Sequence, residues 1–133
     1  MEPQATTNPT AGRKLLCVED EHFISELYVR SLTKAGFDVT VEVDGQKALD
    51  LALTNQFDII LLDLMIPTMT GTEILHILRD PNRQPPLKAK IIITTNLEQR
   101  EDVRAQVEAQ ADGYLVKADI TPHELADFLQ TIK

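Results

Sequence analysis

Short apolar runs alternate with amphipathic stretches of helical length along almost the whole of this 133-residue chain. The runs are rich in β-branched residues and cover residues 15–18, 39–43, 59–62, 91–95 and 114–116. Strands that alternate with helices favour a parallel sheet with helices on both faces, so this order constrains the fold more than any other feature. We predict an α/β fold with a doubly wound (βα)5 arrangement.

The pattern within each run predicts its place in the sheet. Runs 15–18, 59–62 and 91–95 are apolar at nearly every position, which is typical of central strands buried on both faces. The run at 39–43 instead alternates valine with Thr40 and Glu42. We therefore expect this run to form an edge strand with one wetter face.

Helix ends are marked by residues with known terminal preferences. Gly36 is expected to end a first helix over residues 21–35, because glycine readily adopts the left-handed backbone. Thr121, Pro122 and Glu124 supply a cap, a first-turn proline and a capping-box glutamate for a last helix. Further helices are expected after Asp44-Gly45, after residues 70–72 and over 98–110, with a proline-rich loop at 79–90.

Charge and cysteine content exclude several classes of protein. Lys and Arg number 13 and Asp and Glu number 21, so the net charge of −8 disfavours direct nucleic-acid binding. A single cysteine excludes an internal disulfide and a cysteine-rich zinc module. No apolar run reaches the roughly 20 residues of a membrane span. We expect a cytoplasmic protein with a flexible tail at residues 1–12 and one domain at 13–133.

Polar residues stand at the ends of four of the runs. Glu19 and Asp20 follow the first run, Asp63 follows the third, Thr95 ends the fourth and Lys117 follows the fifth. Ligands of open parallel α/β sheets bind beyond the carboxyl ends of the strands, where these residues meet. The sequence therefore predicts a crevice that contains two or three carboxylates, a hydroxyl and an ammonium.

This set of groups favours phosphoryl chemistry. Crowded carboxylates repel one another, so three of them imply raised pKa values or a bound cation. Oxygen ligands of this kind suit Mg²⁺ or Mn²⁺. A divalent cation beside an ammonium and a hydroxyl can hold a phosphoryl group while a carboxylate oxygen attacks phosphorus.

Four segments resemble the receiver domain of two-component response regulators, and the resemblance covers residues 14–133. They occur in the family's order: LLCVEDE (15–21), DIILLDLMIPTMTG (58–71), IIITT (91–95) and DGYLVKAD (112–119). The resemblance implies a flavodoxin-like strand order of 2-1-3-4-5. It also implies Mg²⁺-dependent phosphorylation by a histidine kinase or a histidine phosphotransfer protein. The chain would be no enzyme beyond catalysing its own aspartyl phosphorylation and dephosphorylation.

The resemblance also implies roles for the residues at the crevice. Asp63 is the phosphoacceptor and a metal ligand, Asp20 binds the metal directly, and Glu19 acts mainly through metal-bound water. The backbone carbonyl of Met65 completes the metal site.

Three further residues match the family's switch. Thr95, which lies 22 residues before Lys117, contacts the phosphoryl group through its hydroxyl, and Lys117 pairs with Asp63 or its phosphate. Tyr114 matches the aromatic residue that moves inward when Thr95 engages the phosphate. This movement would remodel the face built from the fourth helix, the fifth strand and the fifth helix.

The chain departs from the family at several positions. Ala118 replaces the usual proline after a cis bond, so either a trans bond or a retained strained bond is expected. Asn96 replaces the small residue after the switch threonine and alters access to the phosphate. Met65 and Leu97 are apolar and cannot orient water, which predicts slow self-dephosphorylation.

Plainer interpretations exist for single residues. Asp20 and Glu21 could be helix caps, and we expect Glu21 to face water outside the site. Tyr114 could belong to the core. A Rossmann cofactor site is disfavoured because no glycine-rich turn follows the first run. A haloacid dehalogenase-type phosphatase needs a second aspartate where Met65 stands.

The expected function is that of a stand-alone receiver, because the last helix reaches Lys133. Such a protein signals by docking or relays phosphate to a downstream protein, and the sequence leaves open a phosphorylation-linked homodimer. The alternative is a receiver-fold interaction module that works without phosphorylation.

Overall fold

The computed structural model describes residues 12–96 and 100–132. One sheet contains five parallel strands in the order β2-β1-β3-β4-β5, which confirms the predicted α/β class and strand order. The strands are β1 (Lys14–Val18), β2 (Asp38–Glu42), β3 (Ile59–Asp63), β4 (Lys90–Thr95) and β5 (Gly113–Val116). The tail predicted at residues 1–12 lies outside the described residues, except for Gly12.

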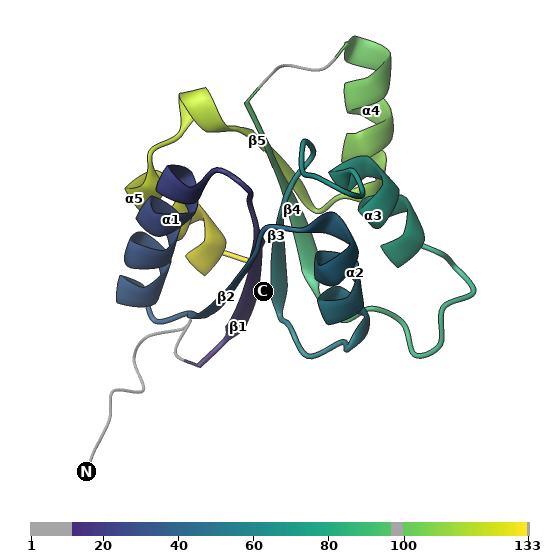
Figure 1. Ribbon diagram of the computed structural model, residues 1–133, viewed down its shortest axis with the longest axis horizontal. Helices are drawn as coiled ribbons and strands as arrows, with labels where there is room; N and C mark the ends of the chain where they lie inside the picture. Colours follow the sequence, from purple (N-terminus) through teal and green to yellow (C-terminus); the bar gives the residue numbers. More distant parts are fainter. Residues whose placement is uncertain (1–11, 97–99, 133) are drawn as a thin grey trace.

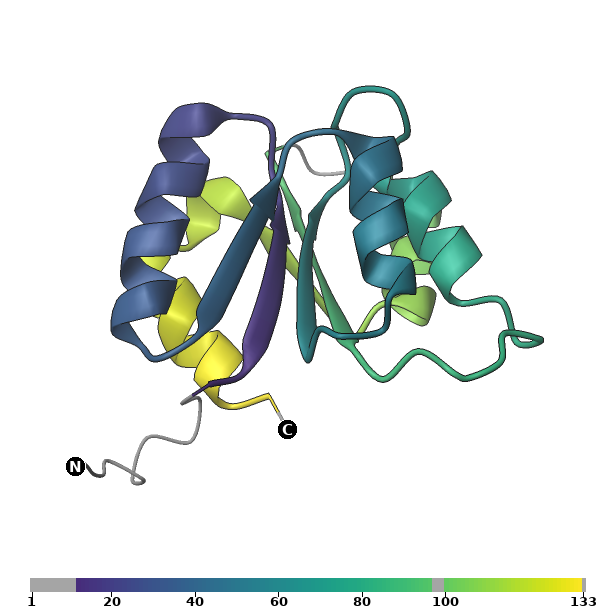
Figure 2. The same cartoon turned by 60° about the horizontal axis from the view of Figure 1, so that its bottom comes forward.

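Helices cover both faces of the sheet. They are α1 (His22–Lys34), α2 (Gly45–Leu53), α3 (Gly71–Leu78), α4 (Glu101–Gln110) and α5 (Pro122–Gln130), and a short 3₁₀ turn, η1 (Lys117–Asp119), precedes α5. Helices α1 and α5 pack on one face, whereas α2, α3 and α4 lie on the other (Figures 1 and 2). The start that the sequence predicted for α4, at residue 98, lies outside the described residues.

Alternating residues of the central strands build two separate cores. Leu16 and Val18 of β1 point into the core under α2 and α3, while Leu15 and Cys17 point into the core under α1 and α5. This alternation follows from the period of two residues along a strand. Edge strand β2 lacks a fully buried residue, as its alternating sequence predicts.

The ends of the helices carry the caps that the sequence indicates. Gly36, two residues after α1, has a φ of +104°, in the left-handed region that favours glycine. Thr70 and Thr121 each accept a hydrogen bond from the N3 amide, and the glutamate at N3 reaches back to the cap amide. These local signals fix where α3 and α5 begin.

Gly71 brings the start of α3 against the end of β3. A Cβ atom at this position would lie 2.3 Å from the carbonyl oxygen of Asp63 and 2.7 Å from the Cα of Leu64. The amide of Gly71 donates to the carbonyl of Leu64 at 3.0 Å. The backbone around Asp63 is therefore held in place by an approach that only glycine permits.

Candidate functional site

Strand register brings the predicted polar residues to one edge of the sheet. Val18 lies opposite Leu62, so Glu19 and Asp63 follow at the same level on neighbouring strands. Asp63 lies opposite Thr94, and Thr95 lies opposite Val116, the residue before Lys117. The carboxyl ends of four strands thus meet around one group of polar side chains, Glu19, Asp20, Asp63, Thr95 and Lys117, which we call the pocket.

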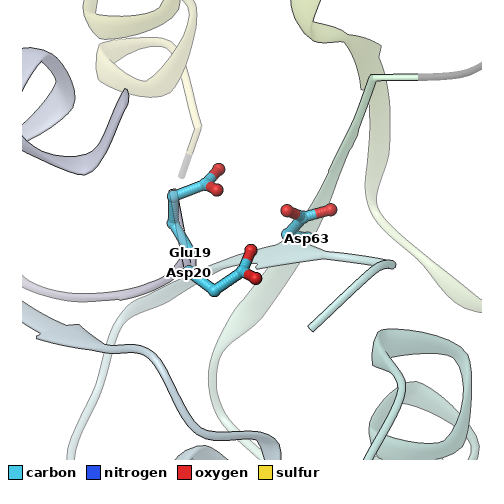
Figure 3. A group of neighbouring side chains, drawn as sticks. All are labelled: Glu19, Asp20 and Asp63. Atoms are coloured by element: carbon cyan, nitrogen blue, oxygen red, sulfur yellow. The ribbon is translucent and has the colours of Figure 1, made fainter. Parts of the chain in front are cut away.

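Three carboxylates cluster in this pocket. Glu19, Asp20 and Asp63 each offer an oxygen within 4.8 Å of the other two (Figure 3). Glu19 is 1 % exposed and Asp63 is 3 % exposed, whereas Asp20 is exposed at the rim. Close carboxylates repel one another, so this arrangement calls for positive charge.

Lys117 supplies one positive charge to the cluster. Its Nζ lies 2.5 Å from Glu19 Oε1 and donates a hydrogen bond to Asp63 Oδ2 at 2.9 Å. Burial lowers the pKa of the Lys117 ammonium, but its bonds to Glu19 and Asp63 outweigh burial and raise that pKa above its usual value. Burial raises the pKa of Glu19, and the bond with Lys117 opposes this shift. Lys117 thus pairs with two of the three clustered carboxylates, Glu19 and Asp63.

Both oxygens of Asp63 are held by other groups of the chain. Oδ2 accepts from Lys117, and Oδ1 accepts from the backbone amide of Met65 at 3.0 Å. The Met65 residue itself is 64 % exposed. The carboxylate of Asp63 therefore has a fixed orientation at the floor of the pocket, while the assignment of the Met65 carbonyl to a metal stays a prediction.

Thr95 and Tyr114 lie on the α4 side of the pocket. Thr95 ends β4 and is fully buried. The partly buried ring of Tyr114 packs against the core under α3 and α4, and the Arg104 guanidinium of α4 lies 4.6 Å from the ring centroid. Tyr114 thus contacts both the core and α4, while its role as a switch residue stays a prediction.

Comparison with known proteins identifies the family of this chain. The response regulator receiver domain family matches residues 15–130. The chain belongs to this family.

Similar proteins support the assignment. The transcriptional regulatory protein CusR of Escherichia coli strain K12 is 37 % identical over 120 residues, which are 90 % of this chain and 49 % of CusR. The receiver chain therefore spans about half the length of this regulator. The Vibrio cholerae chemotaxis protein CheY4 is 31 % identical, with a TM-score of 0.76 over 92 % of this chain and all of CheY4. The BeF3-activated N-terminal receiver domain of Klebsiella pneumoniae RstA is 27 % identical, with a TM-score of 0.75 over 89 % and 96 % of the two chains.

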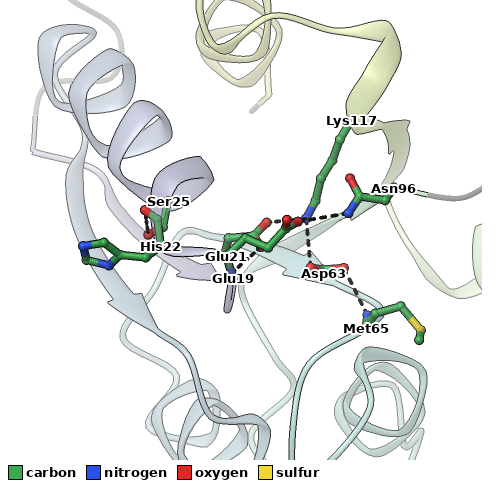
Figure 4. A network of polar contacts seen from close by, with 8 residues as sticks. All are labelled: Glu19, Glu21, His22, Ser25, Asp63, Met65, Asn96 and Lys117. Carbon is green, nitrogen blue, oxygen red and sulfur yellow. Dashed lines mark hydrogen bonds and ion pairs between the residues drawn. The ribbon is translucent and has the colours of Figure 1, made fainter.

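Glu21 is half exposed, as the sequence predicts, but it also makes contacts at the site. It is the N-cap residue of α1, but its side chain extends across the pocket instead of capping the helix. Glu21 Oε1 lies 3.7 Å from Lys117 Nζ and accepts a hydrogen bond from Asn96 Nδ2 at 2.9 Å (Figure 4). The acidic run in the sequence signals extra negative charge here, but no linear pattern predicts the contact with Asn96.

The receiver also departs from its family after Lys117. Within residues 12–96 and 100–132 the only cis peptide bond is Gln84–Pro85, so Lys117–Ala118 is trans and opens the turn η1. Lys117 nevertheless reaches Asp63. Leu97, which the sequence placed beside the site, lies outside the described residues. Across the described part of the chain, no helix is both long and apolar enough to cross a bilayer.

Proposed function

We propose that this receiver accepts a phosphoryl group on Asp63 from a histidine kinase or a histidine phosphotransfer protein, in a reaction that requires Mg²⁺ or Mn²⁺. The observation that carries the proposal is the buried Asp63 carboxylate, fixed between Lys117 and the Met65 amide at an acidic pocket. A carboxylate oriented in this way is suited to attack phosphorus.

The donor set of the pocket fits a divalent cation. Lys117 pairs with only two of the three clustered carboxylates, and Glu19 Oε1 makes no hydrogen bond besides its ion pair with Lys117. Carboxylate and carbonyl oxygens are the ligands that Mg²⁺ prefers. We assign Asp20, Asp63 and the Met65 carbonyl as direct ligands, with Glu19 acting through water. A bound cation would supply positive charge to the phosphoryl oxygens.

Group transfer follows from the positions of the chain's own residues. An Asp63 oxygen attacks phosphorus, the new O–P bond forms as the P–N bond of the donor's phosphohistidine breaks, and the imidazole nitrogen leaves with the electron pair. Lys117 then pairs with the phosphoryl oxygens, and the Thr95 hydroxyl donates to one of them. Dephosphorylation uses the same residues: a water oxygen attacks phosphorus, the bond between phosphorus and the Asp63 oxygen breaks, and the carboxylate leaves as inorganic phosphate forms. The chain therefore catalyses only its own modification.

Signalling follows from movement of Thr95 toward the phosphoryl group. Such a movement shifts the end of β4, and the Tyr114 ring follows into the space beside Thr95. Because Tyr114 also contacts Arg104, this repacking changes the face formed by α4, β5 and α5. Helix α4 has a single fully buried residue, Val107, and is the helix with the least packing to lose.

Incubation with acetyl phosphate and Mg²⁺, followed by intact-mass measurement, separates this function from that of a phosphorylation-independent interaction module. The wild-type chain is expected to gain the mass of one phosphoryl group, and Asp63→Asn is expected to gain none. Asp58→Asn is the matched control, because Asp58 opens β3 at its other end and holds the Lys14 amide. Absence of a mass gain on the folded wild type would favour the interaction module.

A further inference from the structure

Glu21 and Asn96 join two parts of the chain that lie 75 residues apart. Glu21 stands at the N-terminus of α1, and Asn96 directly follows β4. The hydrogen bond between their side chains, at 2.9 Å, passes beside the Lys117 ammonium (Figure 4).

The same Glu21 oxygen also takes part in the charge balance of the pocket. Glu21 Oε1 lies 3.7 Å from Lys117 Nζ, and Lys117 is at the same time the partner of Asp63. Glu21 is half exposed, so its carboxylate can move into water when its partners are drawn away. Lys117 thereby connects the phosphoacceptor to the contact between Glu21 and Asn96.

We propose that Glu21 and Asn96 form a latch that holds Asn96, and with it the end of β4, in the unphosphorylated position and opens when Asp63 is phosphorylated. The inference rests on the proposed phosphorylation of Asp63. Glu21 and Asn96 act through Lys117 and Thr95, so they are positioning residues and touch no reacting atom.

Two physical effects open the latch. A phosphoryl group carries about −1.5 to −2 charges where the Asp63 carboxylate carried one, so it repels the Glu21 carboxylate more strongly and competes with it for Lys117. Asn96 is bonded directly to Thr95, so a shift of Thr95 toward the phosphoryl group carries Asn96 with it. Both effects lengthen the hydrogen bond, and the latch therefore favours the unphosphorylated state.

Side-chain amide resonances of Asn96 report the latch directly. In the metal-free chain, Glu21→Ala is expected to shift these resonances. Glu26→Ala is the matched control, because Glu26 lies on α1 and pairs with His22 at 3.2 Å. Saturating Mg²⁺ and beryllofluoride, a phosphoryl mimic, should move the wild-type resonances toward their position in Glu21→Ala. Resonances that stay in place at saturation would overturn the latch.

A double-mutant cycle separates the latch from simple loss of charge. Glu21→Ala and Asn96→Ala are each expected to bind beryllofluoride about two- to tenfold more tightly at constant Mg²⁺, the range for one hydrogen bond. The double variant should gain less than the product of the two single gains, because each single variant already breaks the shared hydrogen bond. The separate charge effect of Glu21 cancels in the cycle, so the coupling reports the hydrogen bond alone. Single gains that multiply fully would contradict the latch.

Glu21→Gln gives a further test, because it keeps an oxygen acceptor for Asn96 and removes the charge. It should retain the coupling to Asn96→Ala at least in part, while Glu21→Ala loses it. Failure of the latch and failure of the proposed function have different signatures. If the wild type binds beryllofluoride but the effects of the Glu21 and Asn96 variants are independent, the latch alone is overturned. If the wild type binds no beryllofluoride, both the latch and the proposed phosphorylation of Asp63 are overturned.

Discussion

The Nζ atom of Lys117 lies 2.9 Å from Oδ2 of Asp63, although the two residues are 54 positions apart in the chain. Both side chains are buried, and Glu19 shares the same ammonium. A single cation thus compensates the two most buried carboxylates of the pocket. The ion pair links the stability of the strand ends to the chemistry that we propose for Asp63.

Removal of this cation is expected to destabilise the fold. Lys117→Met leaves Glu19 and Asp63 buried without their partner, and should lower the free energy of unfolding by about 1.5–3 kcal/mol, as for hydrogen bonds to charged groups. Urea unfolding without divalent cations measures the change. Lys88→Met is the control, since Lys88 is exposed and its Nζ lies 3.7 Å from Asp58, and it should change stability by no more than about 0.5 kcal/mol. Equal effects of the two variants would argue against a structural role for the buried pair.

Divalent cations are expected to stabilise the chain through the acidic cluster. Mg²⁺ at about 100 times its dissociation constant should raise the free energy of unfolding by about 2.7 kcal/mol. Asp20→Asn should remove most of this gain, whereas Asp38→Asn, which changes an exposed aspartate of β2, should keep it. Thermal unfolding with Mg²⁺ and with EDTA at matched ionic strength provides the comparison. If Mg²⁺ stabilises Asp20→Asn as much as the wild type, the cation binds outside the acidic cluster.

Gly71→Ala is expected to disturb the backbone that carries Asp63. The added Cβ would lie 2.3 Å from the Asp63 carbonyl oxygen, and a forced contact of this kind typically costs about 1–3 kcal/mol. Gly113→Ala is the matched variant, because the nearest atom there is the flexible end of Ile92 at 3.0 Å. Urea unfolding should show the larger loss for Gly71→Ala, and the reverse order would contradict the packing described around Asp63.

The capping box of α5 should give stability that depends on pH. The Thr121 amide donates to Glu124, and this bond keeps the pKa of Glu124 below its ordinary value of 4.5. A folded-state pKa below the unfolded one adds stability above the unfolded pKa and loses it as the pH falls through the folded value. The wild type should therefore exceed Glu124→Gln in stability at pH 7, and this difference should vanish in acid. Urea unfolding across pH 2–7 would contradict the assignment if the difference stayed constant.

The sequence predicts those features that depend on neighbours along the chain. Apolar runs identify the strands, and the capping box at Thr121 fixes the start of α5. The convergence of Asp20, Asp63 and Lys117 follows because parallel strands end at one edge of a sheet. These positions are predictable because backbone topology alone determines them.

Contacts that depend on side-chain direction could not be predicted. Glu21 has a sequence position typical of a helix cap, yet its side chain extends toward Lys117 and Asn96. The choice between capping the helix and reaching across the pocket depends on the positive charge of Lys117, which lies near only in the folded chain. The sequence also could not decide the peptide bond before Ala118, because the family pattern has proline there and this chain has alanine. In the structure this bond is trans and lies at the start of the turn η1.

Chemical trapping of the phosphoacceptor tests the central claim most directly. The chain is incubated with acetyl phosphate and Mg²⁺, reduced with borohydride, which converts an aspartyl phosphate to homoserine, and mapped by peptide mass spectrometry. Our account predicts homoserine at position 63 in the presence of Mg²⁺ and none after chelation. An unmodified Asp63 in folded protein, or modification of a different carboxylate, would contradict it.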